Sequence, residues 1–183
     1  MAFTNPEKNI EQLEIPENST VAVFGSGTGA HTFAASRALG NYGRVYAIDA
    51  REDLVKKLKN EARARHLTNI FVIVGNIEIP NGVPLQDQTV DTVIIPNTLF
   101  SADDRWEVLK EAYRITKQDG RILIIDWKDS YDHMGPPKKL IITERQATDF
   151  GLTAGFYFDR KIDAGDHHFG VILKKEKRAT NYW

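Results

Sequence analysis

Three glycines at alternating positions form the most informative chemical motif of the sequence. Gly25, Gly27 and Gly29 lie in the segment Gly-Ser-Gly-Thr-Gly-Ala, between a predicted strand at 20–24 and a predicted helix that begins at Ala30. Glycine allows the backbone to turn sharply and to approach a ligand closely. The N-terminus of the following helix presents free N–H groups and partial positive charge, which suit a phosphate or a carboxylate. The motif therefore indicates a ligand site at the end of the first strand.

A carboxylate follows the next predicted strand, at 44–48. Asp49 comes 20 residues after Gly29, and a carboxylate at this place can accept hydrogen bonds from a ribose diol and would repel a 2′-phosphate. Together with the glycines it indicates a ligand that contains adenosine. The residues alone leave two ligands open, because Gly25-x-Gly27-x-x-Ala30 fits a loose dinucleotide motif whereas Gly-x-Gly-x-Gly fits S-adenosylmethionine better.

Short apolar runs, separated by segments with helical periodicity, must position these residues. The runs lie at 20–24, 44–48, 70–74, 90–95 and 121–125. Continuous apolar strands that alternate with helices are typical of a parallel sheet with helices on both faces. The sequence therefore predicts an α/β fold, Rossmann-like and doubly wound, with a mostly parallel sheet. Ligands of such sheets bind at the carboxyl ends of the strands.

Further helices and a terminal hairpin complete the predicted fold. Ser101 and Asp104 have the spacing of a capping box that would begin one helix, and residues 138–150 are expected to form another. Apolar segments at 156–162 and 169–174 predict a β-hairpin. We expect the hairpin to add an antiparallel strand at one edge of the sheet.

The composition narrows the possible classes of protein. The chain has 183 residues, no cysteine, and 24 Lys and Arg against 25 Asp and Glu. The length predicts one domain over residues 1–183, with 1–18 as a helical lead-in. Disulfides, thiolate metal sites and cysteine nucleophiles are excluded. The balanced charge gives no field that would attract nucleic acid or an anionic membrane. The N-terminal segment has no apolar run that could cross a bilayer, so we expect a cytoplasmic protein without membrane insertion.

Seven segments in a fixed order connect these features to a known family. They are the short helix after Asn5-Pro6-Glu7, VAVFGSGTGAHT, GRVYAIDA, NIFVIVGNIE, VDTVIIPNTLF, EAYRITKQDGRILIIDW and GFYFDRKIDAGDHHFGVILKK. In order and spacing they resemble the class I S-adenosylmethionine-dependent methyltransferases, specifically the small ubiquinone/menaquinone-methylase-like group. The resemblance implies a seven-stranded sheet whose last strand is antiparallel, and S-adenosylmethionine as the cofactor.

The resemblance also implies roles for individual residues at the cofactor. The corresponding positions are Gly25, Ser26, Gly27, Thr28, Gly29, Asp49, Ala50, Asn76, Ile77 and Asn97. The glycine loop would surround the methionine end of the cofactor, and Asp49 would bind the ribose with Ala50 against the adenine face. Asn76 and Ile77 would bind the adenine through a side-chain acceptor and a backbone N–H. Asn97 would lie beneath the sulfonium.

Two positions depart from the family pattern. The family usually has an acid at the position of Val23 and Asp at the position of Asn76. An amide oxygen can still accept a hydrogen bond from the adenine amine, but valine makes no polar contact. Our hypothesis is that the cofactor binds more weakly than is usual for the fold and that Val23→Asp would strengthen binding.

The acceptor side is expected after the fourth and fifth strands. Methyl transfer is an in-line displacement that needs alignment and exclusion of water, and neither a metal nor a covalent intermediate is required. Asp126 and His133 are the candidate catalytic residues, since either could orient or deprotonate an acceptor. The candidate residues of the acceptor pocket are Phe100, Trp127, Tyr131 and His133.

We therefore expect an S-adenosylmethionine-dependent methyltransferase that acts on a small or partner-presented acceptor. The short chain lacks insertions that often roof a large pocket, which favours a small-molecule acceptor, an open cleft or a pocket completed by a partner chain, as in a homodimer. The basic face of residues 56–65 is expected to be solvated, so nucleic acid is not the favoured partner. Two other functions fit parts of the pattern. One is a nicotinamide-dependent oxidoreductase, and the other is a module that binds S-adenosylmethionine without turnover.

Overall fold

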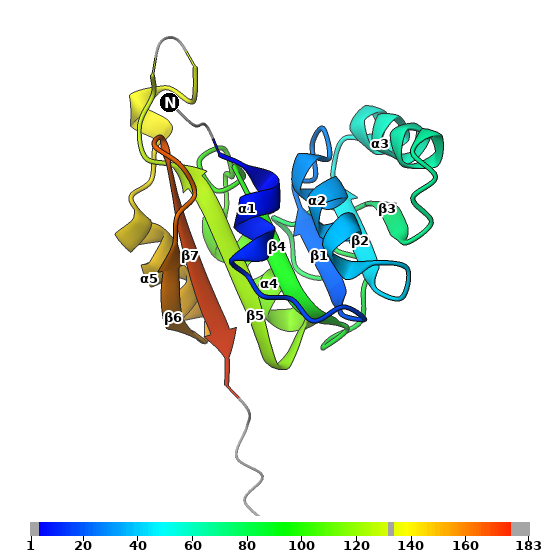
Figure 1. Ribbon diagram of the computed structural model, residues 1–183. Coiled ribbons are helices and arrows are strands. Elements are labelled where there is room, and N and C mark those ends of the chain that lie inside the picture. Colours follow the sequence, from blue (N-terminus) through cyan, green and yellow to red (C-terminus); the bar gives the residue numbers. More distant parts are fainter. Residues whose placement is uncertain (1–3, 132–133, 177–183) are drawn as a thin grey trace, which may run out of the picture.

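A mixed sheet with the strand order β3-β2-β1-β4-β5-β7-β6 forms the centre of the molecule (Figure 1). The computed structural model describes residues 4–131 and 134–176. The strands are β1 (Thr20–Phe24), β2 (Arg44–Asp49), β3 (Ile70–Val74), β4 (Val90–Pro96), β5 (Thr116–Trp127), β6 (Phe156–Ile162) and β7 (His168–Lys175). Strands β1 to β5 pair in parallel, and β7 pairs antiparallel with β5 and with β6. The predicted doubly wound α/β fold with an antiparallel C-terminal strand is therefore confirmed.

Helices cover both faces of this sheet. They are α1 (Pro6–Glu11), α2 (Ala30–Leu39), α3 (Glu52–Ala64), α4 (Arg105–Ile115), the 3-10 helix η1 (Lys138–Leu140) and α5 (Glu144–Ala154). Val21 and Val23 of β1 belong to the same buried cluster as residues of α1 and α2, whereas Phe24 belongs to a cluster with residues of α4 and α5. In the described part of the chain, every helix is too short or too polar to span a bilayer.

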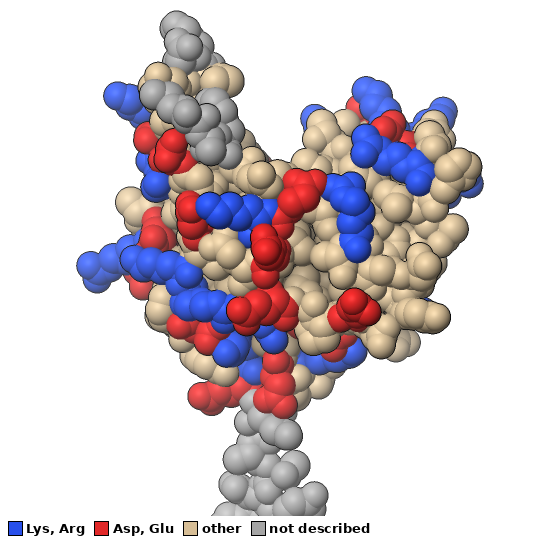
Figure 2. Space-filling view, in the orientation of Figure 1, with Lys and Arg blue, Asp and Glu red and all other residues tan. Residues whose placement is uncertain are grey.

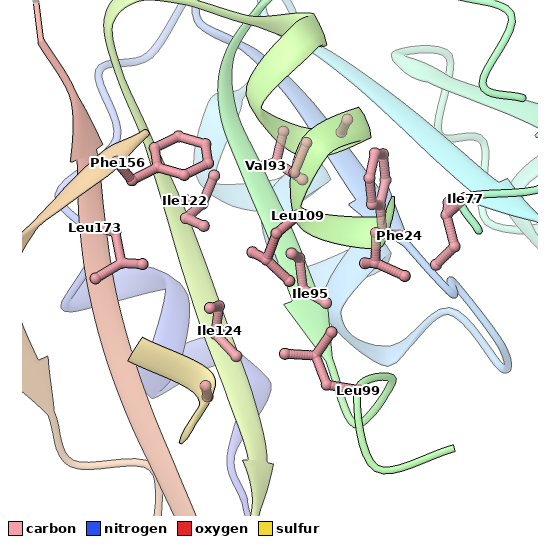
Figure 3. Close-up of a cluster of buried hydrophobic side chains, with 14 of the residues drawn as sticks. Phe24, Ile77, Val93, Ile95, Leu99, Leu109, Ile122, Ile124, Phe156 and Leu173 are labelled. Atoms are coloured by element: carbon pink, nitrogen blue, oxygen red, sulfur yellow. The ribbon is translucent and has the colours of Figure 1, made fainter. Parts of the chain in front are cut away.

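The larger buried cluster lies between the sheet and α4 and α5 (Figure 3). Phe24, Ile95, Leu109 and Ile124 have no exposed surface. Because alternate side chains of a strand point to opposite faces, strands β1 and β4, buried except near their starts, carry apolar residues on both faces. Burial of these strands on both faces holds their carboxyl ends side by side. The end of the sheet at which the parallel strands terminate is called the carboxyl edge below.

Helix α4 begins later than the sequence pattern predicts. Ser101 does not cap it, because the Ser101 hydroxyl donates to the carbonyl of Thr98 at 3.1 Å. The cap is Asp104, whose carboxylate accepts the backbone N–H of Glu107 at 3.0 Å. The predicted capping residue is therefore wrong by three positions, since Asp104 itself has an acid three residues later and makes the competing cap.

The helix predicted over 138–150 is also wrong in its start. Residues 138–140 form only the single turn η1, and α5 begins at Glu144. Thr143 and Gln146 form a reciprocal capping box, in which each side chain accepts the other residue's backbone N–H, at 3.1 and 2.8 Å. The Thr-x-x-Gln spacing marks this start in the sequence.

Candidate cofactor and acceptor site

The loop between β1 and α2 is built from glycines in left-handed backbone conformations. Gly25, Gly27 and Gly29 have φ angles of 62°, 51° and 88°, a region that other residues rarely adopt. A side chain at Gly25 would also come within 2.5 Å of the Thr98 hydroxyl from the β4–α4 loop. The glycines therefore let two loops at the carboxyl edge approach each other closely.

Asp49, at the end of β2, fastens this loop to the sheet. Its Oδ2 accepts the backbone N–H of Gly27 at 2.9 Å, and its Oδ1 accepts the backbone N–H of Arg51 at 3.0 Å. The residue is 9% exposed. A carboxylate has about four acceptor positions, so Asp49 keeps capacity for two further donors. Its position is set before any ligand binds.

The segment after β3 forms a further wall and is held by an acid of α4. Glu111 accepts the backbone N–H groups of Asn81 at 2.9 Å and Val83 at 3.3 Å. Burial opposes ionisation of Glu111, but hydrogen bonds from Arg114 and from these amides outweigh it and lower the pKa of the carboxyl. The Asn76 side chain accepts the backbone N–H of Glu78 at 2.9 Å, which folds this segment into a turn.

These three segments and the loop after β4 surround a cleft of about 460 Å³ at the carboxyl edge. Its lining consists of Gly25, Gly27, Asp49, Ala50, Arg51, Gly75, Asn76, Ile77, Glu78, Asn97, Thr98 and Ser101. This volume falls in the range of small-molecule and cofactor sites, about 300–1,000 Å³. Two buried oxygens near it, Ser26 Oγ and Asn97 Oδ1, have no hydrogen-bond partner within the described residues. Since buried polar atoms are normally hydrogen-bonded, these oxygens fit a polar ligand.

Asp126 lies at the end of β5, behind the β4–α4 loop. It has no exposed surface, and its oxygens accept the backbone N–H groups of Phe100 at 3.1 Å and Trp127 at 2.8 Å. Burial raises the pKa of Asp126 to about 6, although these hydrogen bonds favour the charged form. The carboxylate thereby ties the loop after β4 to the end of β5.

Two aromatic rings at and after the end of β5 contact the histidines that precede or begin β7, the first in a tilted and the second in a stacked arrangement. The ring centroid of Trp127 lies 4.2 Å from that of His168, and the centroid of Tyr131 lies 4.6 Å from that of His167. His167 Nδ1 is 2.6 Å from a carboxylate oxygen of Asp129. The segment after β5 is thus attached to the final hairpin through side chains.

Buried polar side chains from α1, α2 and β7 continue this cluster. Asn9 Nδ2 lies 3.3 Å from His31 Nε2, and burial together with the nearby His168 lowers the pKa of His31 to about 4. Burial likewise lowers the pKa of His168 to about 4. Asn9 Oδ1 and both ring nitrogens of His168 have no hydrogen-bond partner among residues 4–131 and 134–176.

Comparison with known sequences identifies this arrangement. The sequence family described as a methyltransferase domain matches residues 22–124, from within β1 to within β5. The chain belongs to the methyltransferase domain family. Over 94% of its length it also matches a solved structure, the SAM-dependent methyltransferase from Aquifex aeolicus, with 28% identity, 90% of that chain covered and a TM-score of 0.86. The fold and the family together show a class I S-adenosylmethionine-dependent methyltransferase domain, with S-adenosylmethionine as cofactor.

Curated relatives of this methyltransferase are longer proteins. It is 28% identical over 120 residues to demethylmenaquinone methyltransferase of Geobacillus sp. (strain WCH70), which is 66% of this chain and 50% of that protein. It is 31% identical over 117 residues to ubiquinone/menaquinone biosynthesis C-methyltransferase UbiE of Enterobacter sp. (strain 638), which is 62% of this chain and 44% of that protein. The chain spans about half the length of the curated relatives it matches.

Most residues predicted for the cofactor lie together in the methyltransferase. Those that line the cleft are Gly25, Gly27, Asp49, Ala50, Asn76, Ile77 and Asn97. Ser26 is buried beside them, whereas Thr28 lines a neighbouring groove with Phe33 and Leu58. Gly29 is the N-cap of α2, where a side chain would collide with Leu58. Val23 has no exposed surface, so a carboxylate at this position would be desolvated unless a bound cation paired with it.

The residues predicted for the acceptor lie outside the lining of this cleft. Phe100, Trp127 and Tyr131 are absent from its walls, and His133 lies outside the described residues. The sequence reasoning missed Arg51, Gly75, Glu78, Thr98 and Ser101, which do line the cleft. Each follows a predicted strand end within a few residues, which is the signal that could have found them.

Proposed function

We propose that the protein transfers a methyl group from S-adenosylmethionine to a small acceptor with an electron-rich ring, through one domain over residues 1–183. The observation that carries the cofactor part is the contact between Asp49 and the amide of Gly27, which joins two walls of the cleft. A loop fixed in advance loses little conformational freedom when a ligand binds.

The residues present fit the cofactor. Asp49 has acceptor capacity left for a ribose diol, and we assign the adenine to Asn76 and Ile77, where the Asn76 side chain already forms a turn. Ser26 Oγ and Asn97 Oδ1 lack partners within the described chain, so we assign them to the polar methionine end. The predicted cofactor set is completed by Gly25, Gly27, Thr28, Gly29 and Ala50.

When bound, S-adenosylmethionine supplies a methyl group on a sulfonium that a nucleophile displaces in line. The role of the protein is to align the acceptor with the methyl group and to exclude water. Both oxygens of Asp126 accept backbone N–H groups, of Phe100 and Trp127, which supports a positioning role for this carboxylate. Proton transfer by His133 stays a prediction.

We infer that the acceptor is the reduced form of a quinone-type ring, methylated at carbon. Relatives that share half their length with this chain are named as demethylmenaquinone and ubiquinone/menaquinone C-methyltransferases. Trp127, tilted against His168, and Tyr131, stacked on His167, offer apolar rings against which a flat acceptor could pack. Phe100 belongs to the same predicted pocket.

The test combines cofactor binding with turnover. Calorimetric titration should show binding of S-adenosylhomocysteine and no binding of NADH. Incubation of the full chain with 1,4-naphthohydroquinone and S-adenosylmethionine labelled with tritium in the methyl group should then give labelled 2-methyl-1,4-naphthoquinone after oxidation in air. Binding of NADH alone would contradict the cofactor. Binding of S-adenosylhomocysteine without any labelled product would contradict the acceptor class and favour a binding module without turnover.

A further inference from the structure

The two edge strands of the sheet differ in how they are protected against pairing with another chain. Strand β6 carries three consecutive charged residues, Asp159, Arg160 and Lys161. Its pairing with β7 also shifts register between Phe158 and Arg160. Charges and irregular pairing are the usual means by which an edge strand avoids adding a further strand.

Strand β3, at the opposite edge, has neither protection. Its sequence is Ile-Phe-Val-Ile-Val, without a charge or a proline, and it pairs with β2 in unbroken register. The amide of Val45 donates to the carbonyl of Asn69 at 2.9 Å, and the amide of Gly75 donates to the carbonyl of Asp49 at 3.1 Å. Backbone groups of a strand alternate in direction, so Ile70, Val72 and Val74 turn their N–H and C=O groups away from β2.

Apolar surface accompanies these outward backbone groups. Phe71 is 44% exposed and Val74 is 47% exposed. Phe71 pairs with Tyr46 of β2 at a centroid distance of 5.5 Å, and both rings line a groove of about 370 Å³ that follows β3. The edge therefore offers both a row of hydrogen-bonding groups and a hydrophobic surface for alternate side chains.

The charge at the rim of this groove indicates what it binds. Lys59 and Arg63 of α3 line the groove. In the described chain neither has an ion-pair partner, whereas Lys57 and Arg65 of the same helix pair with Asp53 and Glu61. Lys and Arg side chains gather over α3 in Figure 2. A second copy joined antiparallel at β3 would bring two α3 helices to the same face of the combined sheet, where these cations would repel each other.

We propose that the β3 edge binds an extended segment of a partner protein, which adds a strand to the sheet and carries acidic side chains toward Lys59 and Arg63. Backbone hydrogen bonds from Ile70, Val72 and Val74 supply affinity, and the apolar groove and the two cations supply selectivity. This inference is independent of the proposed acceptor.

Two synthetic peptides test the proposal on the full-length chain. The acidic probe is acetyl-EVEITVEI-amide, and the basic control is acetyl-KVKITVKI-amide. In 15N–1H correlation spectra the acidic peptide should shift the amide signals of residues 70–74, and the basic peptide should not. Shifts confined to β6 or to the cofactor cleft, or no shifts at all, would overturn the proposal.

Matched variants sharpen the test. Phe71→Ser should weaken binding of the acidic peptide about ten-fold or more, because it removes apolar surface without adding charge. Phe158→Ser, a change at an equally exposed aromatic residue of the β6 edge, should leave binding unchanged. The double variant Lys59→Glu with Arg63→Glu should bind the basic peptide and no longer the acidic one.

Equal loss in both serine variants would overturn the proposal. So would sedimentation of the wild type as a dimer that Phe71→Ser dissociates, because the occupant would then be a second copy. Circular dichroism melts show whether each variant is folded.

Discussion

The two halves of the carboxyl edge are held in place by different kinds of contact. On the cofactor side, carboxylates bind backbone amides, as Asp49 binds Gly27 and Glu111 binds Asn81. On the proposed acceptor side, Asp126 likewise binds backbone amides. Side chains from distant segments also contact one another there, as the Trp127 ring lies against His168 and Asn9 approaches His31. The cofactor side thus depends on the backbone near its motifs, and the proposed acceptor side depends in addition on docking of the N-terminal helix and the final hairpin.

This difference implies that the two halves have different roles: one half conserves the fold and the cofactor site, and the other half determines the substrate. A backbone-anchored half tolerates changes in most side chains and can serve one cofactor in many proteins. A half made from side-chain contacts changes with each substitution. We therefore expect substitutions on the acceptor side to alter turnover without altering cofactor affinity.

The largest expected effect is that of Asp126→Ala. The substitution leaves the buried N–H groups of Phe100 and Trp127 without their acceptor, so the free energy of unfolding at pH 7 should fall by about 3 kcal/mol. Urea unfolding measures this loss. Methyl transfer should fall with it, while calorimetry should show affinity for S-adenosylhomocysteine close to that of the wild type.

Asp91→Ala provides the matched control at the opposite end of the sheet. Asp91 accepts a hydrogen bond from the backbone N–H of Thr20 at 2.8 Å and forms an ion pair with Lys117, but its side chain is partly exposed. We expect a loss of less than about 1 kcal/mol and normal turnover. If Asp126→Ala lowered cofactor affinity as much as turnover, the two halves would not be separable.

A smaller effect is expected from His31→Gln, as a change in the pH dependence of stability. The folded-state pKa of His31 is about 4, because of burial and then of His168, and Glu7 only partly offsets them, while an unfolded histidine titrates near 6.5. Between these two pH values the unfolded chain binds more protons than the folded chain. The contribution of His31 to the free energy of unfolding is therefore complete above pH 6.5 and is lost as the pH falls toward 4. From pH 7 to pH 5, the wild type should lose about 2 kcal/mol more than His31→Gln does.

Urea titrations at several pH values measure this difference. His168→Gln should flatten the pH dependence in the same way, because burial lowers the pKa of His168 to about 4 as well. Burial raises the pKa of Asp126 to about 6, so this carboxyl changes stability with pH in the opposite direction. Because Asp126 is present in the wild type and in both variants, its contribution cancels in the comparison. A pH dependence that is the same in wild type and His31→Gln would show that the acceptor-side cluster does not hold a neutral His31.

The sequence predicts the cofactor side much better than the acceptor side. The glycine loop and Asp49 could be located because local motifs and strand ends determine them, and β1 and β3 have the predicted bounds. The sequence does not decide whether Ser101 or Asp104 caps α4, because both are good capping residues. Only the hydrogen bond from Ser101 to Thr98 shows that Asp104 is the cap.

Contacts on the acceptor side have no local signature. Asn9 and His31 are 22 positions apart, and Trp127 meets His168 only because β5 and β7 pair in one register. Such contacts depend on the tertiary fold, so candidates such as Trp127 can be predicted from the sequence but their partners cannot. The lining of the cleft by Thr98 and Glu78 likewise depends on how two loops meet.

The central claim is that Asp49 holds both the glycine loop and the ribose of the cofactor, and calorimetric titration of S-adenosylhomocysteine into Asp49→Asn tests it most directly. Asp53→Asn, a change at an exposed carboxylate in the first turn of α3, is the control. We predict that Asp49→Asn weakens binding about ten-fold or more, through loss of charge-assisted hydrogen bonds, and that Asp53→Asn binds like the wild type. Equal affinities in wild type and Asp49→Asn would contradict the account.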